Sequence, residues 1–470
     1  MTGRARFALA AAALALGGCA SFSQDGGFGA VQEAARERLG KELRWKKTDA
    51  DAQSIRATVR ELLARPLSDD DAVHIALLNS PALQAAYAEL GIAEADLVQA
   101  ASGPNLRLHA LRTKYGSDVA KVEESFGFEI LGVLLMPLRR KMEARRFERV
   151  QADVTAEVMR TALEARKAWI AAVAAEEALR YAEQVKTSAE AASELARRMA
   201  EVGNWPKLNH MREQAFYAEA AAQHARAKHA VVAARERLAR TLGLWGEDLA
   251  FRLPERLPDL PPAPRVYDDL ERRAIEQRLD VRAARRELDW LAEALGLSEA
   301  TRFVSAVEFS RARTKEGPDP FAYGYVLGLE IPIFDWGRAR VARAEASYRQ
   351  AVERLVDTAV RARSEVRESY AAYRSAYDLA RHYRDELVPL RKRISEEVLL
   401  RYNGMLASAF ELLADARESI ATVTASLEAK RDFWMADAEL QASLSGRTMH
   451  AGAEPPAAAA RMPAGAGRGH

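Results

Sequence analysis

The sequence predicts a mainly α protein with a small β part, built from two similar halves that each carry a long α-helical hairpin and a pair of strands. Residues 112–130 and 313–331 repeat one another without a gap. Eight positions are identical: Arg112/Arg313, Thr113/Thr314, Lys114/Lys315, Gly116/Gly317, Asp118/Asp319, Gly127/Gly328, Glu129/Glu330 and Ile130/Ile331. The spacing far exceeds a solenoid period of roughly 20–50 residues. It therefore indicates a duplicated half-protein.

Composition favours long packed helices over a compact α/β enzyme. The 470 residues are 49% apolar, so the chain can bury a large core. Ala, Glu, Arg and Leu dominate the helical stretches, where Gly and Pro are sparse. The formal charge is only +2, and no basic tail or stripe occurs, so we expect no nucleic acid as a partner.

The N-terminus reads as a secretion signal. Arg4 and Arg6 precede the apolar run 7–16, which is shorter than the ~20 residues of a membrane-spanning helix. Leu16-Gly17-Gly18-Cys19 resembles the bacterial lipobox, which implies cleavage after residue 18 and a lipid on Cys19. An ordinary signal peptide with a chance cysteine is the alternative. Cys19 is the only cysteine, which excludes an intramolecular disulfide.

The remaining chain divides where composition and periodicity change. We expect these segments: a lipidated N-terminal tether with short helical pieces (19–67), a first repeat (68–252) with a β-hairpin at 105–131, a Pro-rich equatorial linker (253–267), a second repeat (268–445) with a β-hairpin at 302–332, and a disordered tail (446–470).

Strict alternation of large apolar residues with small or polar residues marks the strands of both halves. Tyr323, Tyr325 and Leu329 fall on one side of a strand, and Glu330 falls on the other. Large apolar residues opposite an acid are typical of a lipid-facing barrel wall with a wet lumen. Glu330 and its repeat equivalent Glu129 are therefore expected in the lumen. A soluble sheet lying on a helical core is the alternative.

A long helix follows each hairpin, over about 138–202 and about 338–402. Each has ~64 residues, or ~95 Å at ~1.5 Å per residue. Asp335 is the expected N-cap of the second. Shorter helices return over about 208–242 and 409–444. In each half, the return helix and the short helix before the β-hairpin together have about the same length as the long helix, so they can lie end to end beside it. The linker would wrap the waist where the short helices meet.

Four strands cannot close a barrel, and open sheet edges are not tolerated in lipid. Two chains would supply eight strands and three would supply twelve, and both numbers are allowed. In either case, helices continuing from the strands would form a tube. A barrel joined to a helical tube is a conduit.

Three motifs resemble the TolC-like outer membrane efflux protein family over about 68–445. The run 332–338 is similar to the family's strand-to-helix junction, with Pro332, Asp335, Gly337 and Arg338 as its marked residues. Residues 71–83 resemble its opening helix, and 401–413 its second hairpin tip. The resemblance implies a homotrimer with a 12-stranded transmembrane barrel and a periplasmic tunnel. It also implies an outer-membrane location, a periplasmic adaptor protein and an inner-membrane pump.

The resemblance also assigns roles to residues at the helical tips. Glu411 matches an acid that narrows the periplasmic entrance, and Asp415 lies next to the second such position, Ala414. Three copies of Glu411 would attract cations. A solvated acid favoured by the helix dipole is the alternative. The expected adaptor contacts are Gly203, Asn204, Leu208, Gly404, Met405, Leu406 and Phe410. Gly203 and Gly404 are expected to end their helices with positive φ.

No catalytic, cofactor-binding or metal-binding constellation occurs in the sequence, so we expect a protein that is not an enzyme. His224 and His229 are spaced too far apart to share a helix face. Two alternatives to a channel remain: a periplasmic adaptor, and a coiled-coil scaffold lipoprotein without a pore. The sequence leaves the exported substrate open among drugs, metal ions, small organic molecules and protein.

Overall fold

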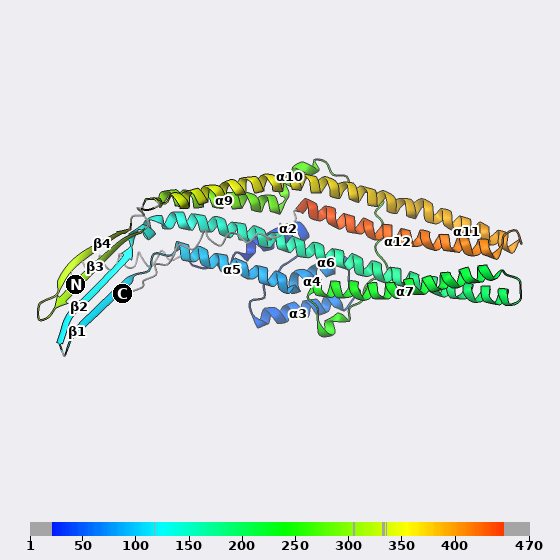
Figure 1. Cartoon of the computed structure of the whole chain (residues 1–470), viewed down its shortest axis with the longest axis horizontal. Coiled ribbons are helices and arrows are strands. Elements are labelled where there is room, and N and C mark those ends of the chain that lie inside the picture. The colour runs from blue at the N-terminus through cyan, green and yellow to red at the C-terminus, as the bar shows by residue number, and fades with distance from the viewer. Residues whose placement is uncertain (1–20, 117, 304–305, 331–333, 335, 446–470) are drawn as a thin grey trace.

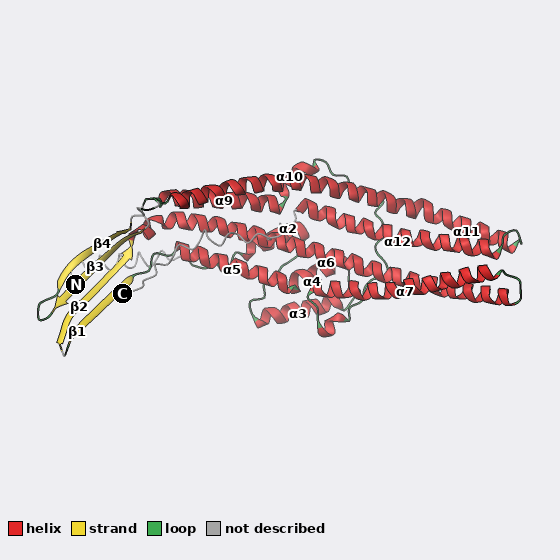
Figure 2. Cartoon of the chain, in the orientation of Figure 1, coloured by secondary structure: helices red, strands yellow, loops and turns green. Residues whose placement is uncertain are grey.

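The protein is an elongated rod, with its strands at one end and two helical hairpin tips at the other (Figures 1 and 2). The computed structural model describes residues 21–116, 118–303, 306–330, 334 and 336–445. The expected signal peptide, Cys19 and the tail at 446–470 lie outside the described residues. The mainly α fold class with a small β part is confirmed.

Both halves follow one order: two short helices, two strands, a long helix and a return helix. The first half contains α4 (Asp69–Asn79), α5 (Pro81–Ala101), β1 (Arg107–Tyr115), β2 (Asp118–Glu129), α6 (Ile130–Glu201), α7 (Lys207–Leu242) and the short turn η1 (Gly246–Leu249). The second half contains α8 (Leu270–Gln277), α9 (Leu279–Ala300), β3 (Ala306–Glu316), β4 (Ala322–Glu330), α10 (Arg338–His382), the π-helical turn η2 (Tyr383–Leu387), α11 (Val388–Asn403) and α12 (Ala409–Ser445). This shared order is the structural counterpart of the sequence repeat.

Prolines account for the helix boundaries that differ from expectation. Pro81 starts a new helix after an extended Ser80, so the opening helix is two helices. α6 begins at Ile130 and runs through Pro137, so the expected start near residue 138 is wrong. The second long helix is not continuous. Pro389 has no N–H to donate to the carbonyl of Asp385, and η2 precedes it.

The four strands form one antiparallel sheet in the order β1-β2-β3-β4, so β1 and β4 are its edges. Glu129 pairs with Glu308 across β2 and β3. Residues paired across strands share a face, and the register places Glu330 on this same face. Phe309 and Leu329 lie on the opposite face. The alternation expected from the sequence is therefore present in the sheet.

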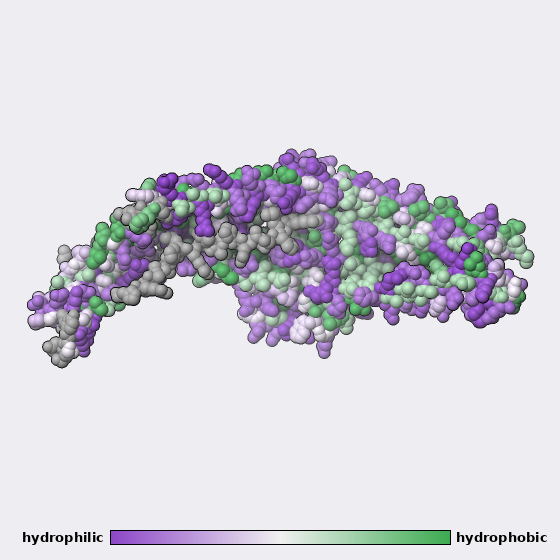
Figure 3. Space-filling view, in the orientation of Figure 1, coloured by the Kyte–Doolittle hydropathy of each residue, from purple (hydrophilic) through white to green (hydrophobic). Residues whose placement is uncertain are grey.

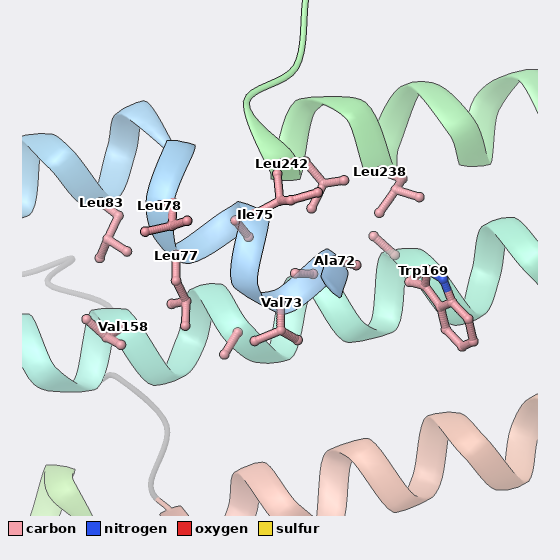
Figure 4. Close-up of a cluster of buried hydrophobic side chains, with 14 of the residues drawn as sticks. Ala72, Val73, Ile75, Leu77, Leu78, Leu83, Val158, Trp169, Leu238 and Leu242 are labelled. Carbon is pink, nitrogen blue, oxygen red and sulfur yellow. The ribbon is translucent and has the colours of Figure 1, made fainter. Parts of the chain in front are cut away.

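The principal core lies at the middle of the rod, where α4 packs against α5, α6 and α7 (Figure 4). Ile75 and Leu77 of α4 are completely buried. Trp169 of α6 donates its Nε1–H to the carbonyl of Leu67 at 2.7 Å, which fixes the start of α4. Ser68 caps that helix by accepting from the backbone N–H of Asp71 at 3.1 Å.

The N-terminal segment packs onto this core from residue 28 onward. It forms α2 (Phe28–Leu39) and α3 (Asp49–Leu63). Val31 and Ala35 are fully buried, and the Phe28 ring meets the Tyr87 ring edge-on at 5.0 Å. Much of the segment expected as a tether is thus part of the folded body.

The Pro-rich linker crosses the rod at its waist and is held by both halves. Leu257 donates its backbone N–H to Glu177 of α6 at 3.2 Å. The hydroxyl of Tyr377 in α10 donates to the carbonyl of Pro262 at 3.0 Å, and Trp434 of α12 donates to Pro258 at 3.0 Å. Tyr377 belongs to a second, aromatic core between α10 and α12. The linker therefore ties three helices together.

Helices of the second half are less buried within one chain than those of the first. α6 buries many residues along its length, whereas α11 contains no buried residue. Exposed apolar side chains on α10 and α11 include Val356, Val360, Leu379, Leu390, Leu399 and Leu400. Among the described residues, no helix combines the length and apolar character needed to cross a membrane.

Candidate functional site: the two ends of the rod

One face of the sheet carries large apolar side chains that no described part of the chain covers. The sheet projects beyond the helical body (Figure 1). Tyr323, Tyr325, Leu327 and Leu329 of β4 are all largely exposed. A sheet in a soluble protein would bury such a face against another layer. The alternative of a sheet lying on the helical core is therefore wrong.

The opposite face is acidic and lined with small residues. Glu129, Glu308 and Glu330 lie near the helical end of the sheet. Arg107 forms an ion pair with Glu308 at 3.3 Å. The two acids expected in the lumen, Glu129 and Glu330, thus share the face opposite the aromatic residues. Their contact with a water-filled lumen stays a prediction.

The strand-to-helix junction of the second half requires a glycine. Gly337 has φ 67°, and a Cβ added there would lie 2.6 Å from the carbonyl oxygen of Arg302. Gly337 occupies the N-cap position of α10, which begins at Arg338, so Asp335 is not the N-cap. Pro332 and Asp335 lie outside the described residues. Phe334, next to them, is 98% exposed.

The first helical tip closes with a glycine in the left-handed region. Gly203 has φ 77° and donates its N–H to the carbonyl of Ala200 at 3.1 Å. Asn204 donates to Met199 at 2.9 Å, which completes a Schellman motif. Trp205, the next residue, is buried, whereas Asn204 and Leu208 are exposed. Positive φ at Gly203 agrees with the expectation.

The second tip closes with the same hydrogen bonds, but a methionine takes the left-handed position. Met405 has φ 61° and donates to Tyr402 at 3.0 Å, and Leu406 donates to Arg401 at 2.8 Å. Gly404 has φ −80°, so the expected positive φ at Gly404 is wrong. α11 ends at the residue directly before Gly404, whereas α6 ends two residues before Gly203. Met405 is 94% and Leu406 82% exposed.

Glu411 and Asp415 have different surroundings. Glu411 forms a capping box at the start of α12, because it accepts from the N–H of Ser408 at 2.9 Å and donates its own N–H to the Ser408 hydroxyl at 3.2 Å. Its side chain is otherwise exposed. Asp415 is buried, with its carboxylate 3.6 Å from the Arg391 guanidinium of α11. Only Glu411 is thus placed at the surface of a single chain.

Phe410, expected among the docking residues, lies between the two hairpins. Its ring is half-buried, and the guanidinium of Arg212 on α7 lies 5.7 Å from the ring centroid. Such a contact holds α12 against α7. Phe410 therefore contributes to packing of the tips against each other, and Met405 and Leu406 remain the most exposed apolar residues of the second tip.

An ion pair between a buried glutamate and a half-buried arginine lies behind the tips and was not expected from the sequence. Glu213 of α7 is 1% exposed and accepts a hydrogen bond from Arg417 of α12. The Arg417 guanidinium also lies 4.8 Å from the centroid of the Phe216 ring. The pair joins the first hairpin to the second. No sequence signal marks it, because the two residues come from helices whose relative placement only the fold determines.

Charge at the end of α6 is neutralised locally. Arg197 and Arg198 both donate hydrogen bonds to Glu194, which lower the pKa of that carboxyl to about 2. Arg197 also pairs with Glu201 at 2.6 Å. These pairs at helical spacing support the last turns of an exposed helix.

Comparison with known proteins agrees with this architecture. Residues 270–395 match the family described as "Outer membrane efflux protein". The Campylobacter jejuni CmeC outer membrane channel is similar in structure, with TM-score 0.68, 16% identity, and coverage of 87% of this chain and 91% of that chain. The Neisseria gonorrhoeae MtrE outer membrane channel is also similar, with TM-score 0.66 and 19% identity. The match covers 80% of this chain and 90% of that chain.

The outer membrane protein VceC of Vibrio cholerae gives a TM-score of 0.65 at 16% identity, covering 84% of this chain and 97% of that chain. A search of the curated proteins found no match. The resemblance drawn from the three motifs is confirmed. The chain has the fold of these outer-membrane channels, and residues 270–395, within its second half, match the outer membrane efflux protein family.

Proposed function

We propose that this chain is the outer-membrane channel component of a tripartite efflux or secretion system. It would act as a passive trimeric conduit from the periplasm to the exterior. The observation that carries this proposal is a single rod that joins a two-faced, open-edged sheet to two helical hairpins. The match to the efflux protein family favours this function over the adaptor alternative.

The sheet edges support a closed ring of identical chains. The outer edges of β1 and β4 have no strand partner in the described part of one chain, and open edges are not tolerated in lipid. If β4 of one copy pairs with β1 of the next, the contact is heterologous and generates a ring. Three copies give twelve strands, an allowed number for a bacterial barrel. Exposed apolar residues on α10 and α11 would be covered by the neighbouring copies.

The partners follow from the two ends of the tube. An inner-membrane pump would supply the energy, because the chain carries no phosphate-binding loop. A periplasmic adaptor would dock at the tips, on Gly203, Asn204 and Leu208 in one and Met405 and Leu406 in the other. A lipid on Cys19 would anchor the mature N-terminus. Mass analysis of the N-terminal peptide tests this modification directly, and an unlipidated Cys19 would refute it.

Assembly and face assignment test the proposal together. We expect a heat-sensitive trimer that needs detergent for extraction and conducts in a planar bilayer. Leu329→Arg should destabilise assembly by ~2–4 kcal/mol near the bilayer midplane. Glu330→Gln, one residue away, should leave assembly intact and alter conductance. A salt-soluble monomer would overturn the channel proposal, and equal assembly defects in both variants would overturn the lumen assignment.

A further inference from the structure

The aromatic face of the sheet becomes basic toward the hairpin turns. From the helical end, its paired rows read Val307–Leu329, then Phe128–Phe309–Leu327, then Leu108–Phe126–Arg311–Tyr325, then Ala110–Glu124–Arg313–Tyr323, then Arg112–Val122–Lys315. The first two rows are entirely apolar, and each later row contains at least one cation. Figure 3 shows hydrophobic residues on the sheet beside hydrophilic ones at its hairpin end.

Three of these cations have no acidic partner in the chain. Arg313 donates to Glu124 at 2.6 Å and is therefore neutralised. Within the described part of the chain, no carboxylate pairs with Arg112, Arg311 or Lys315, which we call the outer cations. Arg311 lies over the Tyr323 ring, 5.7 Å from its centroid.

The opposite face of the same strands lacks such unpaired charge. Its Arg and Lys residues before the register shift of β1, which leaves Lys114 aside, are Arg107, paired with Glu308, and Lys121, paired with Glu123. Simple solvation of strand ends would place unpaired cations on both faces. The excess positive charge is confined to the face that also carries the apolar band, so it points to an anionic partner on that side.

Arg112 and Lys315, in the last row, lie at the level where a membrane's polar region begins, and Arg311 lies two rows before them. From Val307 to Lys315 the strand advances about 27 Å at ~3.4 Å per residue, or roughly 20 Å along a barrel axis at a tilt of ~40°. Phe303 and Trp336, which meet edge-to-face at 6.5 Å, bound the apolar band at the helical end. Tyr323 and Tyr325 bound it at the other. The distance from this aromatic pair to the row of Lys315 thus approaches the ~25 Å height of a barrel's lipid-facing belt.

We propose that the outer cations bind the phosphate-bearing head groups of outer-leaflet lipids. This inference rests on the proposed function, which orients the hairpin turns outward. Guanidinium groups match phosphate geometry, and Arg311 can extend its stem along the apolar rows to bring its charge to that level. Three copies would place nine unpaired cations in a ring around the barrel. Anionic head groups would then complement the unpaired positive charge on this face of the sheet.

The test compares matched double variants of the purified trimer. Arg112→Gln with Lys315→Gln removes two outer cations. Arg107→Gln with Lys121→Gln removes two cations from the opposite face of the same sheet. Binding of bisphosphorylated lipid A and of its dephosphorylated form is measured by native mass spectrometry, and planar-bilayer conductance is recorded for every protein. Inorganic phosphate at millimolar concentration serves as the competitor.

We expect wild type to prefer the phosphorylated lipid, with less preference at high salt. Each removed cation should weaken its binding about fivefold, hence about 25-fold for the outer double variant. The control pair should bind as wild type. Equal binding of both lipid forms, an equal loss in the control pair, or full displacement by inorganic phosphate would overturn the inference. A conducting trimer without phosphate preference overturns this inference alone, whereas failure to form a conducting trimer overturns the proposed function as well.

Discussion

The two helical tips close with the same pair of hydrogen bonds and differ in the residue that occupies the left-handed position. Gly203 takes it in the first tip and Met405 in the second. A residue with a Cβ in this region costs roughly 1–2 kcal/mol, whereas glycine adopts it freely. The first tip also turns Trp205 inward, while the second leaves Met405 and Leu406 outside.

Strain combined with exposed apolar surface distinguishes a binding tip from a structural turn. Backbone strain tends to persist where function requires it. Met405 keeps an unfavourable backbone conformation while its side chain contacts almost nothing within the chain. The first tip has no such strain, because glycine holds its left-handed position, and its exposed apolar residues Val202 (70%) and Leu208 (57%) are less exposed than Met405 and Leu406. We therefore expect the second tip to dominate adaptor binding and the first to serve mainly in assembly.

The largest expected effect tests whether the two tips act as one unit. Arg417→Met would leave Glu213 buried without its partner, and breaking such a pair costs about 3 kcal/mol or more. We expect a clear drop in the midpoint of thermal unfolding and easier separation of the hairpins. The double variant Glu213→Leu with Arg417→Met should recover most of the loss. An Arg417→Met trimer as stable as wild type would show that the hairpins are held independently.

The next prediction uses matched glycines. Gly203→Ala forces a Cβ into the left-handed region and should destabilise the first hairpin by roughly 1–2 kcal/mol. Gly404→Ala places the same methyl group where φ is −80°, so its effect should lie within about 0.5 kcal/mol of zero. Denaturant unfolding of the two variants measures the difference. Equal losses would contradict the one-residue offset between the tips.

Met405→Gly separates strain from contact. Removing the Cβ should stabilise the trimer by about 1 kcal/mol while weakening crosslinking to the adaptor. Met405→Ala is the control, because it keeps the strain and removes the rest of the side chain. If both variants crosslink as well as wild type, Met405 is not a docking residue. If only the glycine variant loses crosslinking, the rigid backbone and not the side chain makes the contact.

The smallest effect on stability is expected from Glu411→Gln. Glutamine can also occupy this position of a capping box, so unfolding should stay within a few tenths of a kcal/mol of wild type. Removal of three negative charges at the entrance should lower cation selectivity and divalent block in a planar bilayer. Wild-type selectivity in this variant would mean that Glu411 serves only to cap α12.

Local patterns predicted the features that depend on one segment at a time. The alternation of apolar and polar residues at 323–330 predicted the two faces of β4. The left-handed conformation of Met405 could not be predicted in this way. The hydrogen bonds of the last helical turn decide which residue becomes left-handed, and the sequence Asn403-Gly404 suggested Gly404 instead. The pair of Glu213 and Arg417 depends on how two hairpins lie side by side. Pro389 is visible in the sequence as a residue that removes one helical hydrogen bond. That a π-helical turn accommodates this loss could be seen only in the structure.

The linker across the waist has a consequence for how such a chain can evolve. It contacts α6, α10 and α12 at the middle of the rod, far from both the tips and the sheet. Substitutions that are far apart and share no partners add in their effects on unfolding free energy. Changes at Met405 and at Leu329 should therefore combine additively in a double-variant cycle. Descendants could acquire a new docking partner and adjust to a different membrane in separate steps, neither step restricting the other.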